Sequence, residues 1–153
     1  DFEPNQIDIV IHPQSIIHSM VELKDKSIKA QMGVPDMKIP IQFALSYPRH
    51  FESSWEALDF YEIGSLTFER PDFEKFPSIG LAYRALEKLG SSCAALNLAN
   101  DHAVNFFLSG KINFNEIAKI NEDVLENHPW LEEPNLNDLL ELGSWVDEYL
   151  SKY

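Results

Sequence analysis

The chain contains little cysteine and few basic residues. Its 153 residues include one cysteine, Cys93, and 12 Lys and Arg against 25 Asp and Glu. A single thiol cannot form an intrachain disulfide or the Cys-x-x-Cys pair of a metal knuckle, so we expect a reducing, cytoplasmic location. The net charge of -13 argues against nucleic acid and anionic membranes as partners, because both need clustered cations.

Long apolar runs and the common catalytic motifs are also missing. No run approaches the roughly 20 apolar residues that span a bilayer. There is no Gly-x-Gly-x-x-Gly, no phosphate-binding loop, no His-Glu-x-x-His and no Gly-x-Ser-x-Gly. These residues alone leave the function unassigned, and they indicate that a complete active site does not lie within this stretch. The chain starts at Asp1 rather than Met, which suggests a processed chain or part of a longer one.

The first half of the sequence has the patterns of strands and turns. Residues 7–11 are rich in β-branched side chains and predict a buried strand. Residues 19–23 and 27–32 alternate with a period of two on either side of a short polar tip, which predicts an antiparallel hairpin. Residues 40–46 suggest a short helix, and residues 65–69 another strand. A lone hairpin is marginal in water, so this one should join a larger sheet or meet a partner.

The second half has the period of helices. Apolar stripes run through residues 79–89, 92–109, 113–125 and 137–150, with glycines or an Asn capping box at the ends. Four such helices joined by short links predict a small bundle. We therefore expect an α+β fold, in which an N-terminal sheet element with a hairpin precedes a C-terminal helical bundle. The two prolines of residues 71–77 indicate a linker between these parts.

Residues 11–18, Ile-His-Pro-Gln-Ser-Ile-Ile-His, are the first candidate site. A strand that runs into a proline turn often places side chains in a cleft. The alternative is structural, with one histidine capping the turn and the other hydrogen-bonded in the sheet. The spacing of His12 and His18 matches no metal-ligand pattern.

Residues 33–37, Gly-Val-Pro-Asp-Met, are the second candidate. The loop directly follows a predicted strand, and the flexible, polarisable side chain of Met37 suits contact with a flat ring. The alternative is an ordinary turn with Met37 in the core. Elsewhere we expect Cys93 to be a buried small residue, His102 a core or interface histidine, and His50 and His128 exposed.

Several motifs in order along the chain resemble the 1-deoxy-D-xylulose 5-phosphate reductoisomerase family. They are Ile-His-Pro-Gln-Ser-Ile-Ile-His-Ser-Met-Val at residues 11–21, Pro-Asp-Met-Lys-Ile-Pro-Ile at 35–41, and Ala-Leu-Asn-Leu-Ala-Asn-Asp at 95–101. The resemblance covers nearly all 153 residues but less than half of a full-length member, namely its C-terminal part. Asp101 and Arg49 depart from the family's usual pattern.

The resemblance implies an oxidoreductase that converts 1-deoxy-D-xylulose 5-phosphate to 2-C-methyl-D-erythritol 4-phosphate in non-mevalonate isoprenoid biosynthesis. It implies NADPH and Mg²⁺ or Mn²⁺ as cofactors of the full-length enzyme, and a homodimer. Residues 1–70 would be the end of the central catalytic and dimerisation domain, residues 71–77 a linker, and residues 78–153 the C-terminal bundle. The dinucleotide fingerprint and the metal ligands would lie upstream of Asp1.

The resemblance also implies a secondary role for four residues here. Ser15, His18, Pro35 and Met37 would line the substrate and nicotinamide pocket, and Met37 would contact the cofactor. We expect no catalytic residue and no metal ligand in this chain, no cofactor bound to it, and no activity from it alone. The alternative is a non-enzymatic interaction or dimerisation module that retains the fold.

Overall fold

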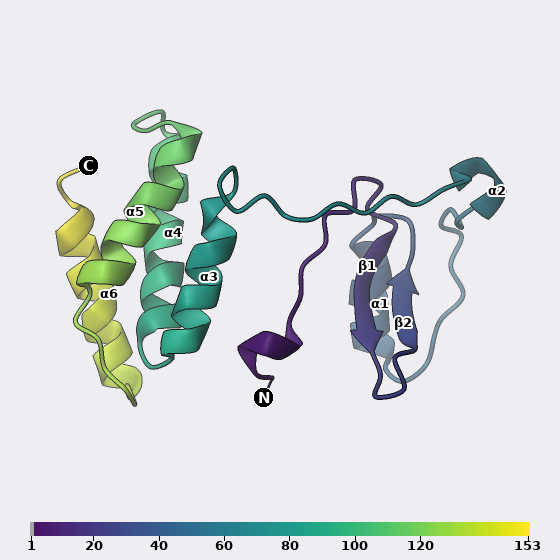
Figure 1. Ribbon diagram of the computed structural model, residues 1–153, viewed down its shortest axis with the longest axis horizontal. Coiled ribbons are helices and arrows are strands. Elements are labelled where there is room, and N and C mark those ends of the chain that lie inside the picture. The colour runs from purple at the N-terminus through teal and green to yellow at the C-terminus, as the bar shows by residue number, and fades with distance from the viewer. Residues whose placement is uncertain (1) are drawn as a thin grey trace. The chain divides into compact units, whose positions relative to one another are not determined.

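The computed structural model describes residues 2–153 and divides them into two compact units, residues 9–71 and residues 2–8 with 72–153. The first unit contains the strands β1 (Ile17–Glu22) and β2 (Ile28–Met32), followed by the helices α1 (Lys38–Ser46) and α2 (Phe60–Ile63). The second unit is helical. The α+β class expected from the sequence, a hairpin followed by a helical bundle, is therefore confirmed (Figure 1).

β1 and β2 form an antiparallel two-stranded sheet with Met20 opposite Ala30 and Val21 opposite Lys29. The pairing is irregular between Ile17 and Ser19. The polar tip closes where Leu23 N donates to Ser27 O at 2.9 Å, and Lys26 has a positive φ of 69°. The hairpin predicted from the period of two is thus formed, with most of its side chains exposed.

The two other predicted strands are reduced to a single bridge. Ile11 and Glu69 exchange both backbone hydrogen bonds at 2.9 Å, and neither residues 7–10 nor 65–68 continue the ladder in the described chain. The prediction of a buried strand over residues 7–11 is wrong here, because Ile7 and Val10 are exposed. A β-branched run forms a strand only where a second strand satisfies its backbone.

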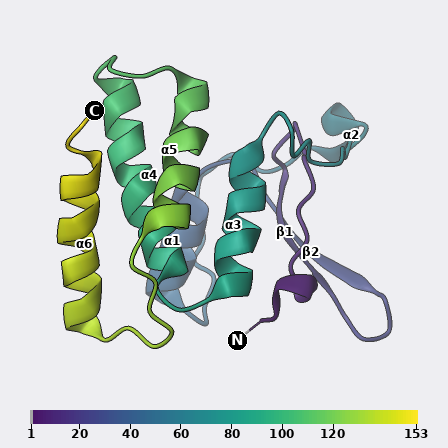
Figure 2. The same ribbon diagram turned by 60° about the vertical axis from the view of Figure 1, so that its left-hand side comes forward.

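The helical unit consists of α3 (Pro77–Lys88), α4 (Ser92–Leu108), α5 (Phe114–Asn127) and α6 (Leu136–Leu150), preceded by the short 3₁₀ helix η1 (Pro4–Gln6). The four long helices run alongside one another in both views (Figures 1 and 2), and α4 contacts each of the other three. Their bounds agree with the sequence prediction to within one or two residues. None of the helices in residues 2–153 is long and apolar enough to cross a membrane.

The core of the bundle depends on small side chains of α4. Ala95, Ala99 and Ala103 recur every fourth residue, so they share one face of the helix, and all three are fully buried. They pack with buried aliphatic side chains of α5 and α6. Small residues on the central helix allow its neighbours to approach closely. The buried partners are Ile120, Val124, Leu142, Val146 and Leu150.

The turn between α3 and α4 is tied to the loop before α6. Ser91 N donates to Leu131 O at 2.9 Å, and Leu131 N donates to Ser91 Oγ at 2.9 Å. Gly90, with a φ of +57°, stands at the tightest point of this contact. The expected capping box at the start of α5 is also present, where Asn113 N donates to Glu116 Oε2 at 2.7 Å.

Candidate functional site

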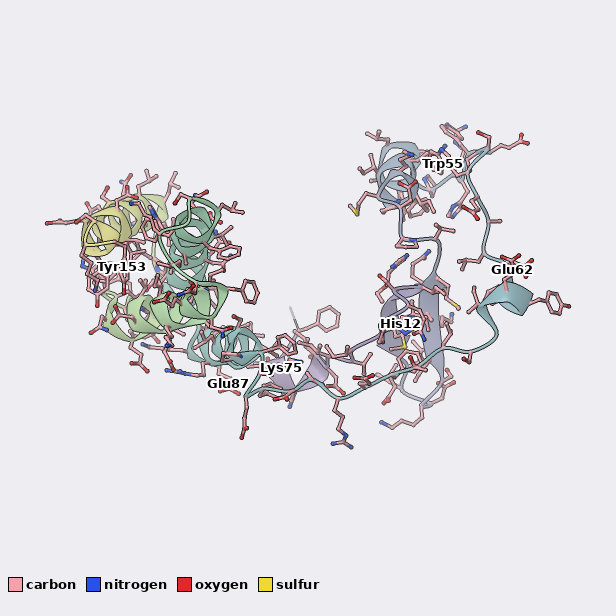
Figure 3. All side chains as sticks on the ribbon, turned by 90° about the horizontal axis from the view of Figure 1, so that it is seen from above. His12, Trp55, Glu62, Lys75, Glu87 and Tyr153 are labelled. Carbon is pink, nitrogen blue, oxygen red and sulfur yellow. The ribbon has the colours of Figure 1, made fainter. Side chains whose placement is uncertain are left out.

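The turn that leads into β1 is anchored to Thr67. His12 Nδ1 lies 2.8 Å from Thr67 O, so this nitrogen carries the proton and donates it to the carbonyl. The side-chain amide of Gln14 donates to Thr67 Oγ1 at 2.8 Å, and the His12 ring stacks on Phe68 with centroids 4.8 Å apart. His12, labelled in Figure 3, thus has the structural role that the sequence left open for one of the two histidines.

Ser15 and His18 lie on either side of the buried Ile16. Ser15 has a φ of 52°, in the left-handed region, and its N–H donates to His12 O at 3.0 Å, so the turn holds its exposed side chain in a defined position. Ile16 O accepts from Gly33 N at 3.0 Å, which joins this turn to the second candidate loop.

His18 lies beside the start of that loop. Its Nε2 is 3.6 Å from the point that a Cβ on Gly33 would occupy, so the imidazole lies over the glycine backbone. His18 is otherwise an exposed residue. The structure therefore brings His18 and Gly33, at the start of the second candidate loop, together.

Asp36 fixes the end of the loop and the start of α1. Its Oδ1 accepts from Lys38 N at 2.9 Å, and Lys38 Nζ lies 3.3 Å from Oδ2. The backbone N–H of Lys38, helped by the ammonium group, lowers the pKa of the Asp36 carboxyl group. Met37 then stands at the first turn of α1 with 70% of its surface exposed, so the alternative that placed it in the core is wrong.

The four residues assigned to the pocket wall are therefore exposed on one short, hydrogen-bonded part of unit 9–71. Ser15 and His18 come from the turn and first strand, and Pro35 and Met37 from the loop after the second strand. They offer a hydroxyl, an imidazole and apolar surface. Such groups can orient and enclose a ligand but are a poor ligand set for a hard cation. Across residues 2–153 no three His, Cys, Asp or Glu side chains gather as a metal site requires.

Sequence reasoning missed the part played by Gln14 and Thr67. Gln14 lies within the motif at residues 11–21 that carried the family resemblance, and Thr67 lies within the strand predicted over residues 65–69. The signal was present, but residues more than 50 positions apart in the chain cannot be paired from one sequence.

The expected burial of Cys93 and the expected exposure of His128 are both wrong, whereas the expectation for His102 is confirmed. Cys93 is exposed, because it lies outside the buried alanine stripe of α4. His128 is buried, with 6% of its surface exposed, because it follows α5 directly and its Nδ1 donates to Leu125 O at 2.9 Å. His102 is half-buried and joins α4 to α6, with Nε2 2.9 Å from Asp147 Oδ1.

Comparison with known proteins gives a consistent result. The family model for the DXP reductoisomerase C-terminal domain matches residues 32–149. The 1-deoxy-D-xylulose 5-phosphate reductoisomerases of Caldanaerobacter subterraneus and Acetivibrio thermocellus are 53% and 50% identical over 141 and 142 residues. These matches cover 92% and 93% of this chain but 37% of each relative, so the chain spans little more than a third of their length.

Solved structures agree. The reductoisomerase from Zymomonas mobilis in complex with NADPH is 43% identical, with a TM-score of 0.82 over 91% of this chain and 37% of that one. A DOX-P reductoisomerase in complex with NADPH, fosmidomycin and magnesium is 39% identical, with a TM-score of 0.90 over 97% of this chain and 39% of that one. Fold, motifs and identity coincide, and the chain belongs to the 1-deoxy-D-xylulose 5-phosphate reductoisomerase family, of which it represents the C-terminal part.

Proposed function

We propose that these residues are part of an enzyme that converts 1-deoxy-D-xylulose 5-phosphate to 2-C-methyl-D-erythritol 4-phosphate, with NADPH and Mg²⁺ or Mn²⁺, on the non-mevalonate route to isoprenoids. Membership of the family supports the activity. The observation that supports a role for this chain in the activity is the exposed side chain of Met37. It follows a loop whose first residue, Gly33, lies beside His18.

In this proposal the chain supplies a wall of the pocket. NADPH, when bound, supplies the hydride. Met37 presents a polarisable thioether that packs against a flat ring and keeps water from the reacting face. His18 and Ser15 offer hydrogen bonds to the polar end of the substrate, and Pro35 lies at a tight bend of the loop, across which Asp36 N donates to Val34 O at 2.7 Å.

The cation does not fit the residues described here. No group of three metal-ligating side chains exists in residues 2–153, and the sequence has no dinucleotide fingerprint. We propose that the metal ligands and most NADPH contacts belong to residues outside this chain, and no step is derived through the cation. On this proposal the 153-residue chain alone is inactive.

The experiment compares this chain with a longer polypeptide that contains it and the upstream part present in the relatives. NADPH absorbance is followed with 1-deoxy-D-xylulose 5-phosphate and Mn²⁺. Oxidation of NADPH only by the longer polypeptide supports the proposal. Turnover by the purified 153-residue chain refutes the claim of inactivity, and the absence of turnover by the longer protein refutes the assigned activity.

The role of Met37 is tested in the longer polypeptide. Met37→Ala should raise the KM for NADPH by about 2- to 10-fold, since a sulfur–ring contact contributes about 0.3–1.5 kcal/mol. Met37→Leu keeps the apolar surface and should recover much of the loss. Leu45→Ala, at an even more exposed apolar position within α1, is the control and should leave the KM unchanged.

We further propose that the protein is a homodimer through its hairpin. Val21 and Ile28 have about 60% of their surface exposed. A strand edge with unpaired backbone groups is normally covered in a native protein. Light scattering of the chain at high micromolar concentration should give the mass of a dimer, and a monomer mass there refutes this.

The second candidate function is a non-enzymatic interaction or dimerisation module with the same fold. The exposed hairpin favours it, because the hairpin offers a surface without offering chemistry. The coding sequence before Asp1 separates the two. A start codon directly before Asp1 supports the module, whereas an in-frame stretch with a dinucleotide fingerprint eliminates it.

A further inference from the structure

A proline occupies the next hydrogen-bonding position after the pairing of Ile11 with Glu69. These two residues exchange both of their backbone hydrogen bonds at 2.9 Å, as one type of pair in an antiparallel ladder does. Such pairs alternate along a ladder, so in the same register the next one joins Pro13 to Thr67. Because proline has no N–H, Pro13 cannot donate to the carbonyl of Thr67, and the backbone pair cannot form in full.

The side chains on either side of Pro13 take the place of this backbone pair. His12 Nδ1 donates to Thr67 O at 2.8 Å, where the proline has nothing to donate. Thr67 N donates to Gln14 Oε1 at 3.3 Å, and the same carboxamide donates from Nε2 to Thr67 Oγ1 at 2.8 Å. The ring of His12 stacks on Phe68 as a cross-strand neighbour does. Side chains therefore satisfy both backbone groups of Thr67.

This anchor stands directly before Ser15, whose backbone conformation is unfavourable. The φ of 52° lies in the left-handed region, where the Cβ of any residue other than glycine is crowded. A residue keeps such a conformation only where the surrounding structure fixes it. After Ser15, the buried Ile16 accepts from Gly33 N at 3.0 Å. Before Ser15, the side chain of Gln14 holds the chain, so the strained residue is fixed on both sides.

The φ of Ser15 determines the direction of its hydroxyl group. A return of φ to the negative range rotates the Cα substituents about the N–Cα bond and turns the side chain elsewhere. A hydrogen bond to a substrate needs its donor or acceptor within a few tenths of an ångström of the productive position. Releasing the carboxamide of Gln14 from Thr67 therefore weakens whatever Ser15 binds, although neither side chain touches that ligand itself.

We propose that Gln14 and Thr67 are positioning residues of the reductoisomerase reaction. Their side-chain contact holds Ser15 in the left-handed conformation that directs its hydroxyl group to the sugar phosphate. The inference rests on the proposed function, which places Ser15 in the wall of the substrate pocket. It adds a role for two residues that act on the substrate only through Ser15.

Steady-state kinetics of the longer polypeptide that contains this chain test the role. Gln14→Leu should raise the KM for 1-deoxy-D-xylulose 5-phosphate by about 2- to 10-fold, the value of one neutral hydrogen bond, and leave the KM for NADPH unchanged. Thr67→Val should act in the same direction, whereas Thr67→Ser keeps the hydroxyl group and should recover most of the loss. Ser27→Ala is the matched control, since it removes a hydroxyl group that donates to Asp25 Oδ1 at 2.6 Å at the tip of the hairpin, and it should change neither KM.

A double-mutant cycle separates positioning from a general loss of structure. If Gln14 acts through Ser15, then Gln14→Leu should raise the KM for the sugar phosphate no further in a Ser15→Ala background. Additive effects of the two substitutions overturn the proposal. So does an unchanged KM in Gln14→Leu when the unsubstituted protein is active.

Hydrogen exchange followed by mass spectrometry tests the anchor without activity. In the longer polypeptide, Gln14→Leu should speed the exchange of residues 12–19 and 65–69 and leave that of α5 unchanged. Unchanged exchange of residues 12–19 overturns the proposal whether or not the protein is active. Faster exchange there in a protein without turnover supports the anchor and refutes the assigned reductoisomerase activity instead.

Discussion

Gly90 is the position at which one added methyl group should destabilise the bundle most. A Cβ built on this residue would lie 2.2 Å from Leu131 O, 3.0 Å from Trp130 Nε1 and 3.1 Å from Glu132 O. The nearest atom is a backbone oxygen, which no rotamer change can move. The carbonyl of Leu131 also accepts from Ser91 N, so a shift that relieves the clash breaks this hydrogen bond.

The expected magnitude has two parts. The φ of +57° costs an L-residue about 1–2 kcal/mol, because its Cβ crowds the following carbonyl. Overpacking at a site that must shift adds about 1–3 kcal/mol. Gly90→Ala should therefore lower the free energy of unfolding by about 2–5 kcal/mol, a large fraction of the usual 5–15 kcal/mol of a domain.

Substitutions at two other glycines measure the conformational cost without the overpacking cost. A Cβ on Gly110, whose φ is +76°, would meet nothing within 4 Å, so Gly110→Ala should cost only the conformational 1–2 kcal/mol, in round terms about 1.5. A Cβ on Gly143, inside α6, would also meet nothing, and Gly143→Ala should stabilise by about 0.5–1 kcal/mol. Urea unfolding followed by circular dichroism at 222 nm measures all three. Equal losses in Gly90→Ala and Gly110→Ala would refute the steric argument.

Further predictions concern the caps, core and pH response of the bundle. Asn135 Oδ1 accepts from Asn137 N at 2.8 Å at the start of α6, so Asn135→Ala should cost about 0.5–2 kcal/mol in urea unfolding. Ala99 is fully buried, so Ala99→Leu should lower the thermal midpoint through overpacking of about 1–3 kcal/mol. Burial lowers the pKa of His128, and the charge of Lys88 lowers it further, although the hydrogen bond to Leu125 O opposes both. The unfolded chain therefore takes up a proton at this histidine more readily than the folded chain does. The free energy of unfolding should fall as the pH drops below about 6.5. His128→Asn should make the free energy of unfolding less dependent on pH between about 7.5 and 5.5, and an unchanged pH dependence would count against this reasoning.

Local pattern was sufficient to predict the helices and the hairpin. The helical period, the glycine after α3 and the capping box before α5 all act within a few residues, so one sequence contains the whole signal. The same holds for the period-two arms of the hairpin. The candidate loop at residues 33–37 was also recognisable, because glycine and proline there restrict the backbone locally.

The predictions that were wrong share one cause, because each depended on contacts that local sequence does not specify. Residues 7–11 have strand composition, but the strand pairing recorded for them is a bridge from Ile11 to Glu69, 58 positions along the chain. His128 follows a helix and precedes a proline, which suggests exposure, yet its imidazole is enclosed against the last turn of α5. Such outcomes depend on which distant segment lies opposite, and that information is spread over the whole chain.

The distribution of buried residues explains why the two halves differ in what they can do alone. In residues 9–71 only Ile16 and Ser46 are buried, whereas the bundle has fully enclosed alanine, isoleucine, valine and leucine side chains on three helices. A sheet of two strands with almost no buried apolar surface has little to offset its conformational entropy. The hairpin unit, which holds Ser15, His18 and Met37, therefore needs further polypeptide to cover it, either upstream residues of the same protein or a second copy. This requirement is independent of the family relationship and agrees with the proposal that residues 9–71 act only as part of a larger molecule, whereas the bundle has a buried core of its own.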